Sequence, residues 1–189
     1  MINTDQIASG LDDVLASPND EGALELIVVR PAVGARELRP EVYLSPEGGV
    51  EGDRWVSSPW LKLADGRPDP RVQLSLMNAR ILRLISGDEE SRMRLAGDNL
   101  IVDLNLSADN LNPGQRLSVG EAVVEITDVA HNGCGKFLSR YGKDAVKFIN
   151  SAKGKRLHLR GLFARIIRPG MVCVGDRVCK VQPQSAIKI

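Results

Sequence analysis

Short runs of aliphatic and β-branched residues recur along the chain, separated by turns rich in Gly, Pro, Asn and Asp. Runs of about four to eight residues bounded in this way are typical of β-strands. Many short strands with few helices predict a mainly β domain, built as a β-barrel with helical insertions. Strands are expected at residues 23–29, 71–76, 99–104, 117–119, 121–129, 161–167, 171–174 and 176–181.

Helices are expected in three places, where apolar residues follow helical spacing. The first covers Thr4 to Leu15, and the last covers Ser139 to Ser151. The second begins after Asn78, whose side chain is a good N-cap, and ends at Gly87. Residues 45–70 are dense in Gly, Pro, Asp and Ser, and they predict a long connection with little regular structure.

The 189 residues suit one folded domain, expected at 21–182 between an N-terminal extension (1–20) and a C-terminal tail (183–189). A net charge of +1 favours neither nucleic acid nor an anionic membrane as a partner. No apolar run approaches the roughly 18 residues of a transmembrane helix. The acidic start of the chain lacks the features of a secretory signal. Three cysteines are too few for a disulfide framework, so we expect a cytoplasmic protein.

The residue with the strongest indication of chemistry is Cys134. It lies in the turn sequence His131-Asn-Gly-Cys-Gly-Lys-Phe137, shortly after the strand expected at 121–129. The flanking glycines allow a ligand to approach the sulfur closely. The imidazole of His131 and the ammonium of Lys136 would favour the thiolate, the form that attacks electrophiles and binds metals. These residues alone leave a reactive sulfur and a structural one both open.

The cysteines allow other interpretations. His131 and Cys134 resemble half of a zinc site, but no close second pair of ligands exists, so neither zinc nor haem is expected. The same two residues resemble a thiol-protease pair, for which a three-residue spacing on a glycine turn is poor geometry. Cys173 and Cys179 are expected at core or half-buried positions. A tight turn between them would place Cys173 opposite Val178, which does not favour a mutual disulfide.

Two groups of charged residues have both a structural and a functional interpretation. Gly48–Arg54 is rich in glycine but lacks the spacing of a P-loop, and on its own it is a turn with an ion pair. Arg160, Arg165 and Arg168 accompany the strand expected at 161–167. They form either a solvated strand edge or a set of guanidinium groups that grips phosphate or another oxyanion.

Several segments, taken in order, resemble the motifs of one family. The resemblance is carried by Gly49–Arg54, Gln73–Leu76, Gly97–Ile101, Leu111–Ala122, Gly161–Gly170 and Val174–Val178, together with the turn cysteine. They are similar to the motifs of the MOSC domain, named for the C-terminal domain of molybdenum-cofactor sulfurases. The resemblance extends from about Ala23 to Val181. The family often has Pro or Ser before its cysteine, where this chain has Asn132-Gly133.

The resemblance implies a stand-alone MOSC protein with a distorted β-barrel and a few peripheral helices. It implies that Cys134 is the catalytic cysteine, with His131 beside it, and that its sulfur either ligates molybdenum in the pterin cofactor or carries a persulfide. Molybdenum accepts a soft thiolate ligand, and the phosphate of the pterin requires positive partners. The residues of the matching motifs expected to hold the cofactor (molybdopterin) are Arg54, Asn99, Lys136, Arg160 and Arg165.

Two functions follow from the resemblance. One is a molybdenum-cofactor oxidoreductase that reduces N-hydroxylated small molecules. Its electrons would come from a separate donor protein, since the chain shows neither iron–sulfur spacing nor a flavin fingerprint. The other is a non-catalytic module that holds cofactor, or a persulfide on Cys134 from a sulfur-donor protein, for a partner. A third interpretation leaves the cysteine vestigial in a domain that only binds a partner.

Overall fold

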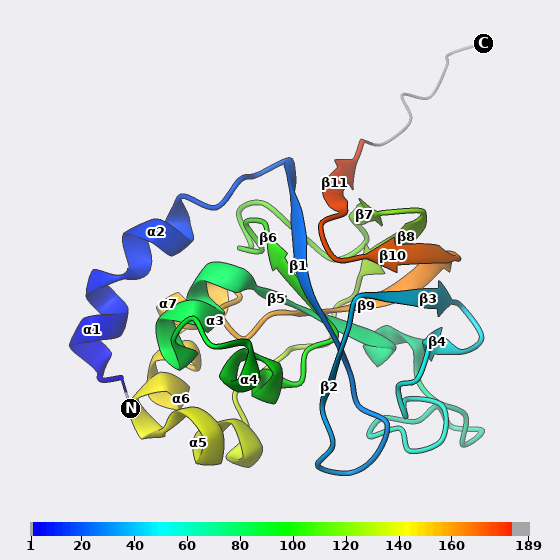
Figure 1. Ribbon diagram of the computed structural model, residues 1–189, viewed down its shortest axis with the longest axis horizontal. Helices are drawn as coiled ribbons and strands as arrows, with labels where there is room; N and C mark the ends of the chain where they lie inside the picture. Colours follow the sequence, from blue (N-terminus) through cyan, green and yellow to red (C-terminus); the bar gives the residue numbers. More distant parts are fainter. Residues whose placement is uncertain (1, 183–189) are drawn as a thin grey trace.

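Seven strands close into a β-barrel in this computed structural model, which describes residues 2–182 (Figure 1). The strands are β1 (Glu21–Val29), β5 (Leu74–Asn78), β6 (Leu100–Asp103), β7 (Arg116–Val119), β8 (Ala122–Ile126), β9 (Leu162–Arg168) and β11 (Arg177–Val181). Their order around the barrel is β11, β7, β8, β9, β5, β6 and β1, and pairing of β1 with β11 closes it. The neighbours β5 and β6 are parallel, so a helical crossover joins them, whereas the other pairs are antiparallel.

Four shorter strands lie outside this closed barrel. β2 (Glu37–Arg39) extends the sheet beyond β1. β10 (Gly170–Cys173), β3 (Glu41–Ser45) and β4 (Gly49–Val50) form a separate three-stranded sheet with β3 in the middle. This small sheet contributes to the barrel core the side chains of Val42, Leu44, Val50 and Val172.

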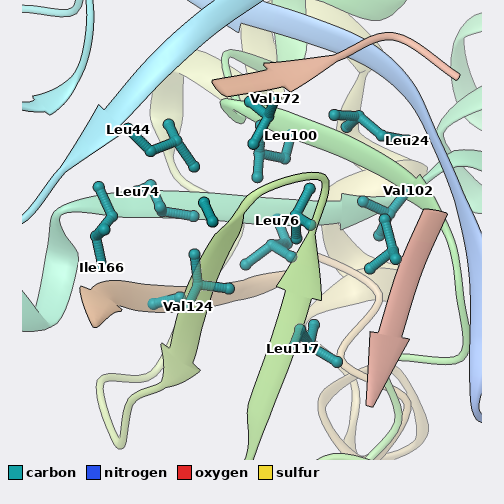
Figure 2. Close-up of a cluster of buried hydrophobic side chains, with 14 of the residues drawn as sticks. Leu24, Leu44, Leu74, Leu76, Leu100, Val102, Leu117, Val124, Ile166 and Val172 are labelled. Atoms are coloured by element: carbon teal, nitrogen blue, oxygen red, sulfur yellow. The ribbon is translucent and has the colours of Figure 1, made fainter. Parts of the chain in front are cut away.

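Aliphatic side chains fill the barrel interior (Figure 2). Leu76 on β5 and Leu100 on β6 belong to this core, and their neighbours Met77 and Ile101 belong to a second core on the outer face. The alternation follows the period of two residues in a pleated strand. Since a fully buried aliphatic side chain contributes about 1.5–3 kcal/mol, the two cores make the barrel a stable frame for the surrounding loops.

Short helices gather on one side of the barrel, over that second core (Figure 1). They are α1 (Thr4–Ser9), α2 (Leu11–Leu15), α3 (Ala79–Ser86), α4 (Glu90–Met93), α5 (Gly135–Tyr141), α6 (Lys143–Ile149) and α7 (Ala152–Arg156). Phe137 and Tyr141 of α5 and Ile149 of α6 are buried among the apolar side chains of this cluster. The segment that follows Cys134 is therefore anchored to the barrel by packing.

The structure confirms the mainly β barrel and several predicted elements. Oδ1 of Asn78 accepts the N–H of Ile81 at 3.0 Å at the start of α3, and Gly87, with φ of +78°, ends that helix. Residues 4–15 are helical as expected, but they form two helices, α1 and α2, divided at Gly10, and Ile7 is fully buried in the second core. The connection at 45–70 is mostly irregular, as expected.

Three predictions of secondary structure are wrong in part. The strand expected at 121–129 ends at Ile126, the last residue of β8. Residues 139–151 do not form one helix, because the chain breaks between α5 and α6 at Gly142, whose φ of +91° is outside the helical range. Residues 71–76 are not all strand. Asp69 caps a 3-10 turn at Pro70–Val72 by accepting the N–H of Arg71, and β5 begins only at Leu74.

Cys173 does not lie opposite Val178, because β10 pairs with β3 whereas β11 pairs with β1 and β7. Cys173 is in register with Glu41, and both Cys173 and Cys179 are half-buried free thiols. The tail expected at 183–189 lies outside the described residues. Between residues 2 and 182 no helix has the length and apolar character that crossing a membrane requires.

Candidate functional site

Cys134 is exposed and stands immediately before α5. Its backbone is extended, and its carbonyl accepts the N–H of Leu138 at 2.9 Å, which starts the helix. Asn150, at the end of α6, holds the preceding turn: its Oδ1 accepts the N–H of Gly133 at 2.9 Å, and its Nδ2 donates to the Gly133 carbonyl at 3.0 Å. Two hydrogen bonds therefore hold the turn that presents the sulfur.

The surroundings of Cys134 favour its thiolate. Partial burial raises the pKa of the thiol, but the backbone N–H groups of Phe137 and Lys136 and the charge of Arg160 lower it by more, so that the pKa lies below its ordinary value. The sulfur is thus both accessible and prepared to act as a nucleophile or a metal ligand.

A cavity of about 480 Å³ opens beside Cys134. Its walls carry aromatic surface from Trp60, Phe137 and Phe163, and among the described residues that line it none is acidic. Six basic side chains line the same cavity: Arg30, Arg36, Arg54, Lys136, Arg140 and Arg160. Such a lining is suited to an anionic ligand with a planar or apolar part.

His131 lines the cavity and lies next to the buried ion pair of Asp98 and Arg160. Its ring stacks on Phe163 with the centroids 4.1 Å apart. Oδ2 of Asp98 accepts a hydrogen bond from Nη1 of Arg160 at 2.5 Å, and Oδ1 of the same carboxylate lies 3.7 Å from Nδ1 of His131. Burial, together with the charges of Arg160 and Arg30, lowers the pKa of His131 well below 6.5. The imidazole is therefore neutral near pH 7, and the positive charge near the thiol comes from Arg160.

The family model of the MOSC domain matches residues 70–179. This stretch includes Cys134 and Arg160 and makes up more than half of the 189 residues. The chain belongs to the MOSC domain family. Among curated proteins none matches the chain.

Solved structures support the MOSC fold independently. The chain is 17% identical to the YuaD protein from Bacillus subtilis, with 86% of this chain and 97% of that one covered and a TM-score of 0.55. It is 18% identical to YiiM from Escherichia coli, covering 86% and 71% with a TM-score of 0.55. A protein described only as hypothetical is 20% identical over 91% and 73% of the two chains, with a TM-score of 0.59. At these identities the likeness shows the fold alone.

Within this MOSC domain the arginines lie close enough to affect one another. Burial, together with the charges of Arg140, Arg30 and Arg54, lowers the pKa of Arg36 to about 10, against an opposing effect of Asp53. The buried Nε atoms of Arg36 and Arg54 have no hydrogen-bond partner. An oxyanion would supply both the missing acceptors and the missing negative charge.

A buried hydrogen-bond network positions Arg30, another of the arginines that line the cavity. Nε and Nη2 of Arg30 donate to the Asp53 carboxylate at 2.7 and 3.0 Å, and Nη2 also donates to Oδ1 of Asn99 at 3.1 Å. Nδ2 of Asn99 donates to Asp53 at 3.0 Å and to the Val28 carbonyl at 3.2 Å. Asn99 is fully buried, and its amide is occupied by these partners. It therefore supports the site from behind and does not line the cavity.

The predicted site residues do not all meet in the MOSC cavity. Those that line it are Cys134, His131, Arg54, Lys136 and Arg160. Arg165 is not among them, because it projects from β9 and donates to the Glu125 carboxylate at 2.5 Å. Arg165 is thus placed as a partner of Glu125 on the barrel surface.

Several residues of the site had no sequence prediction. Asp53 and Asp98 lie inside the matching motifs, but the sequence analysis assigned a role only to their neighbours Arg54 and Asn99. Nothing in the spacing indicated that Asn150 would hold the turn before the cysteine. The other unforeseen members, Arg30, Arg36 and Arg140, come from separate segments that only the fold brings together.

A second cavity of about 310 Å³ is also lined by the segment Ala130–Asn132. It shares this segment and Arg160 with the first cavity, and Lys155 and His158 also line it. Within residues 2–182, no three His, Cys, Asp or Glu side chains gather as they would to hold a metal ion.

Proposed function

We propose that this MOSC protein binds the molybdenum cofactor through Cys134 and reduces N-hydroxylated small molecules. The observation that carries the proposal is the exposed Cys134 beside a cavity of about 480 Å³ with basic walls. The family supplies the cofactor class, and the cavity supplies a thiol donor and cationic groups in the same place.

The residues present fit the cofactor. A thiolate is a soft donor of the kind that molybdenum accepts, and the lowered pKa of Cys134 favours that form. The unpartnered Nε atoms of Arg36 and Arg54 suit the phosphate of a pterin, with Lys136 within the same lining. When bound, the cofactor would supply a metal centre able to pass two electrons to the substrate.

The reaction requires protons, and a side chain in the cavity can transfer them. Reduction of R–NHOH by two electrons and two protons breaks the N–O bond and gives R–NH2 and water. His131 lines the cavity, and its neutral imidazole can relay a proton by accepting one at one ring nitrogen while it releases one from the other. Trp60 and Phe163 provide apolar walls that limit water beside the reacting group. The electrons come from a separate donor protein.

Elemental analysis tests the proposal most directly. Wild type, Cys134→Ser and the control Cys173→Ser would be purified from a host that makes the pterin cofactor, and molybdenum would be measured by mass spectrometry. We expect near-stoichiometric metal in wild type and the control, and its loss in Cys134→Ser. The loaded wild type should then reduce a hydroxylamine substrate with a chemical reductant. Metal-free wild type from such a host contradicts the proposal.

The exposure and lowered pKa of Cys134 also support a second candidate, a sulfur carrier. In that function the Cys134 thiolate attacks the outer sulfur of a donor persulfide R–S–SH, forming Cys134–S–SH and releasing R–S⁻. Intact-protein mass spectrometry separates the two functions. A mass increase of one sulfur atom on Cys134, removed by a reducing agent and unaccompanied by molybdenum, favours the carrier.

A further inference from the structure

The helices that follow Cys134 carry a local excess of positive charge. From Gly135 to Arg156 the chain has seven Lys or Arg residues and one Asp, a net charge of +6. The whole chain has a net charge of +1, so the remaining residues together carry −5. The charge is thus strongly separated between α5–α7 and the rest of the protein.

The lysines of this segment face solvent. Lys143 and Lys147 are the exposed residues of α6 and lie four positions apart, opposite the buried Ala145 and Ile149. The one acidic residue, Asp144, is half-buried. The other exposed lysines of the segment are Lys136, Lys153 and Lys155.

Little within the chain balances these charges. Arg156 forms an ion pair with Asp109 at 3.0 Å. No lysine between residues 135 and 156 forms an ion pair with another described residue. Because like charges on neighbouring turns repel, this arrangement does not stabilise the helices, and it leaves the face able to attract an acidic partner.

The basic face adjoins the candidate site. Cys134 immediately precedes α5, and Lys136 and Arg140 of α5 line the cavity beside it. Lys155 of α7 lines the second cavity, which shares His131 with the first. The middle helix, α6, contacts both α5 and α7, and the three helices lie on one flank of the barrel (Figure 1). A partner seated on them would meet the sulfur-bearing turn.

We propose that the exposed face of α5–α7 is the docking surface for an acidic electron-carrier protein that delivers electrons to the site at Cys134. The inference rests on the proposed function. Lysine ammonium groups are mobile, well-hydrated charges that suit reversible docking, whereas arginine predominates where phosphate is gripped in a bidentate manner. Electron-transfer encounters have small interfaces and are steered by complementary charge. The charge of −5 on the remaining chain opposes an extended polyanion, whereas a compact acidic protein can seat on three short helices.

Direct binding of two probes tests the surface without any need for turnover. The probes are an acidic flavodoxin and an acidic [2Fe–2S] ferredoxin, and the dissociation constant is measured at low and at physiological ionic strength. The test variant is Lys143→Glu/Lys147→Glu/Lys153→Glu, which leaves the cavity lining intact. The matched control, Arg116→Glu/Arg168→Glu/Arg177→Glu, makes the same charge change at exposed positions on β7, β9 and β11.

We expect wild type to bind at least one carrier at low salt, with weakening as salt rises. The helix variant should bind about tenfold more weakly or worse, and the strand control should stay within about threefold of wild type. Equal losses in the two variants would show an effect of net charge alone and overturn the proposal. Absence of binding to both carriers also overturns it, as does tighter binding of wild type to duplex DNA or anionic vesicles through the same lysines.

A small reductant separates this inference from the function on which it rests. Reduced methyl viologen needs no docking surface, so the loaded helix variant should match loaded wild type in dye-driven reduction of a hydroxylamine. Absence of dye-driven activity in loaded wild type contradicts the proposed reductase, while the binding measurements still decide the surface. Loss of dye-driven activity in the helix variant alone would place those lysines in the reaction and overturn their assignment to docking.

Discussion

Oδ1 of Asp98 lies 3.7 Å from Nδ1 of His131, and both atoms are buried without a hydrogen-bond partner. The other carboxylate oxygen of Asp98 is bonded to Arg160. One carboxylate therefore faces both the cation that favours the Cys134 thiolate and the imidazole that lines the cavity. A shift of less than an ångström would let Nδ1–H of His131 donate to Asp98 and leave Nε2 as the proton acceptor.

The depressed pKa of His131 predicts a loss of stability in acid. The native imidazole binds fewer protons than the unfolded one below pH 6.5, so this contribution to stability is complete above that pH and is lost as the pH falls below it. The slope from one such group approaches about 1.4 kcal/mol per pH unit. Urea unfolding of wild type and His131→Gln between pH 7.5 and 5 measures it. The variant should show a shallower decline, and equal slopes would mean that the pKa of His131 is the same in the native and unfolded states.

Thiol reactivity provides a test with an internal control. The pKa of Cys134 lies below 9.0, whereas burial and the carboxylates of Asp176 and Glu41 raise the pKa of Cys173 above 9.0. Alkylation by iodoacetamide, followed peptide by peptide with mass spectrometry between pH 6 and 10, should therefore label Cys134 first. Its rate should also reach half of its maximum at a lower pH. Equal profiles for the two thiols would contradict the environment described for Cys134.

Asn150 is expected to contribute both to stability and to molybdenum retention, although it lies 16 residues after Cys134 in the sequence. Asn150→Ala removes both hydrogen bonds that hold Gly133, at a cost of about 1–3 kcal/mol in unfolding free energy. The released turn should also retain less molybdenum than wild type. Asn112→Ala is the control, because Asn112 is exposed and lines neither cavity. Similar losses of metal in both variants would show that the turn is not held through Asn150.

The barrel was predictable because its signals are local. Alternating aliphatic residues indicate strands such as β5 and β6, and the cap at Asn78 and the glycine at Gly87 mark the ends of α3. The break at Gly142 was missed because apolar residues on both sides keep a nearly helical spacing. The glycine's φ of +91° becomes decisive only when α5 and α6 pack separately on the barrel.

The site was predictable only in part, for a physical reason. Cys134 and Arg160 lie in or beside recognisable motifs, so the sequence indicates them as candidates for the site. Arg36 and Arg140 come from a loop and a helix far apart in the chain, and their shared cavity depends on barrel closure. Arg165 shows the converse: its motif matched the family, yet strand alternation turns its side chain toward Glu125.

Gly161 joins Arg160 of the site to strand β9 of the barrel, and its replacement is expected to lower the stability of the protein strongly. It follows Arg160 with φ of +96°, and a Cβ there would lie 2.0 Å from the Leu76 carbonyl oxygen on β5. Gly175 is a matched control, because its φ is +94° but a Cβ would meet nothing within 4 Å. Both alanine variants incur backbone strain of about 1–3 kcal/mol, and only Gly161→Ala adds a clash with backbone.

Chemical denaturation should therefore show Gly161→Ala losing at least about 2 kcal/mol more than Gly175→Ala, in line with the cost of overpacking a core. The same clash would displace Arg160, whose charge lowers the pKa of Cys134. Alkylation of Cys134 should consequently require a higher pH in Gly161→Ala and stay unchanged in Gly175→Ala. If the two variants lose equal stability and keep the same thiol profile, the close approach of Gly161 to β5 does not hold Arg160 in place.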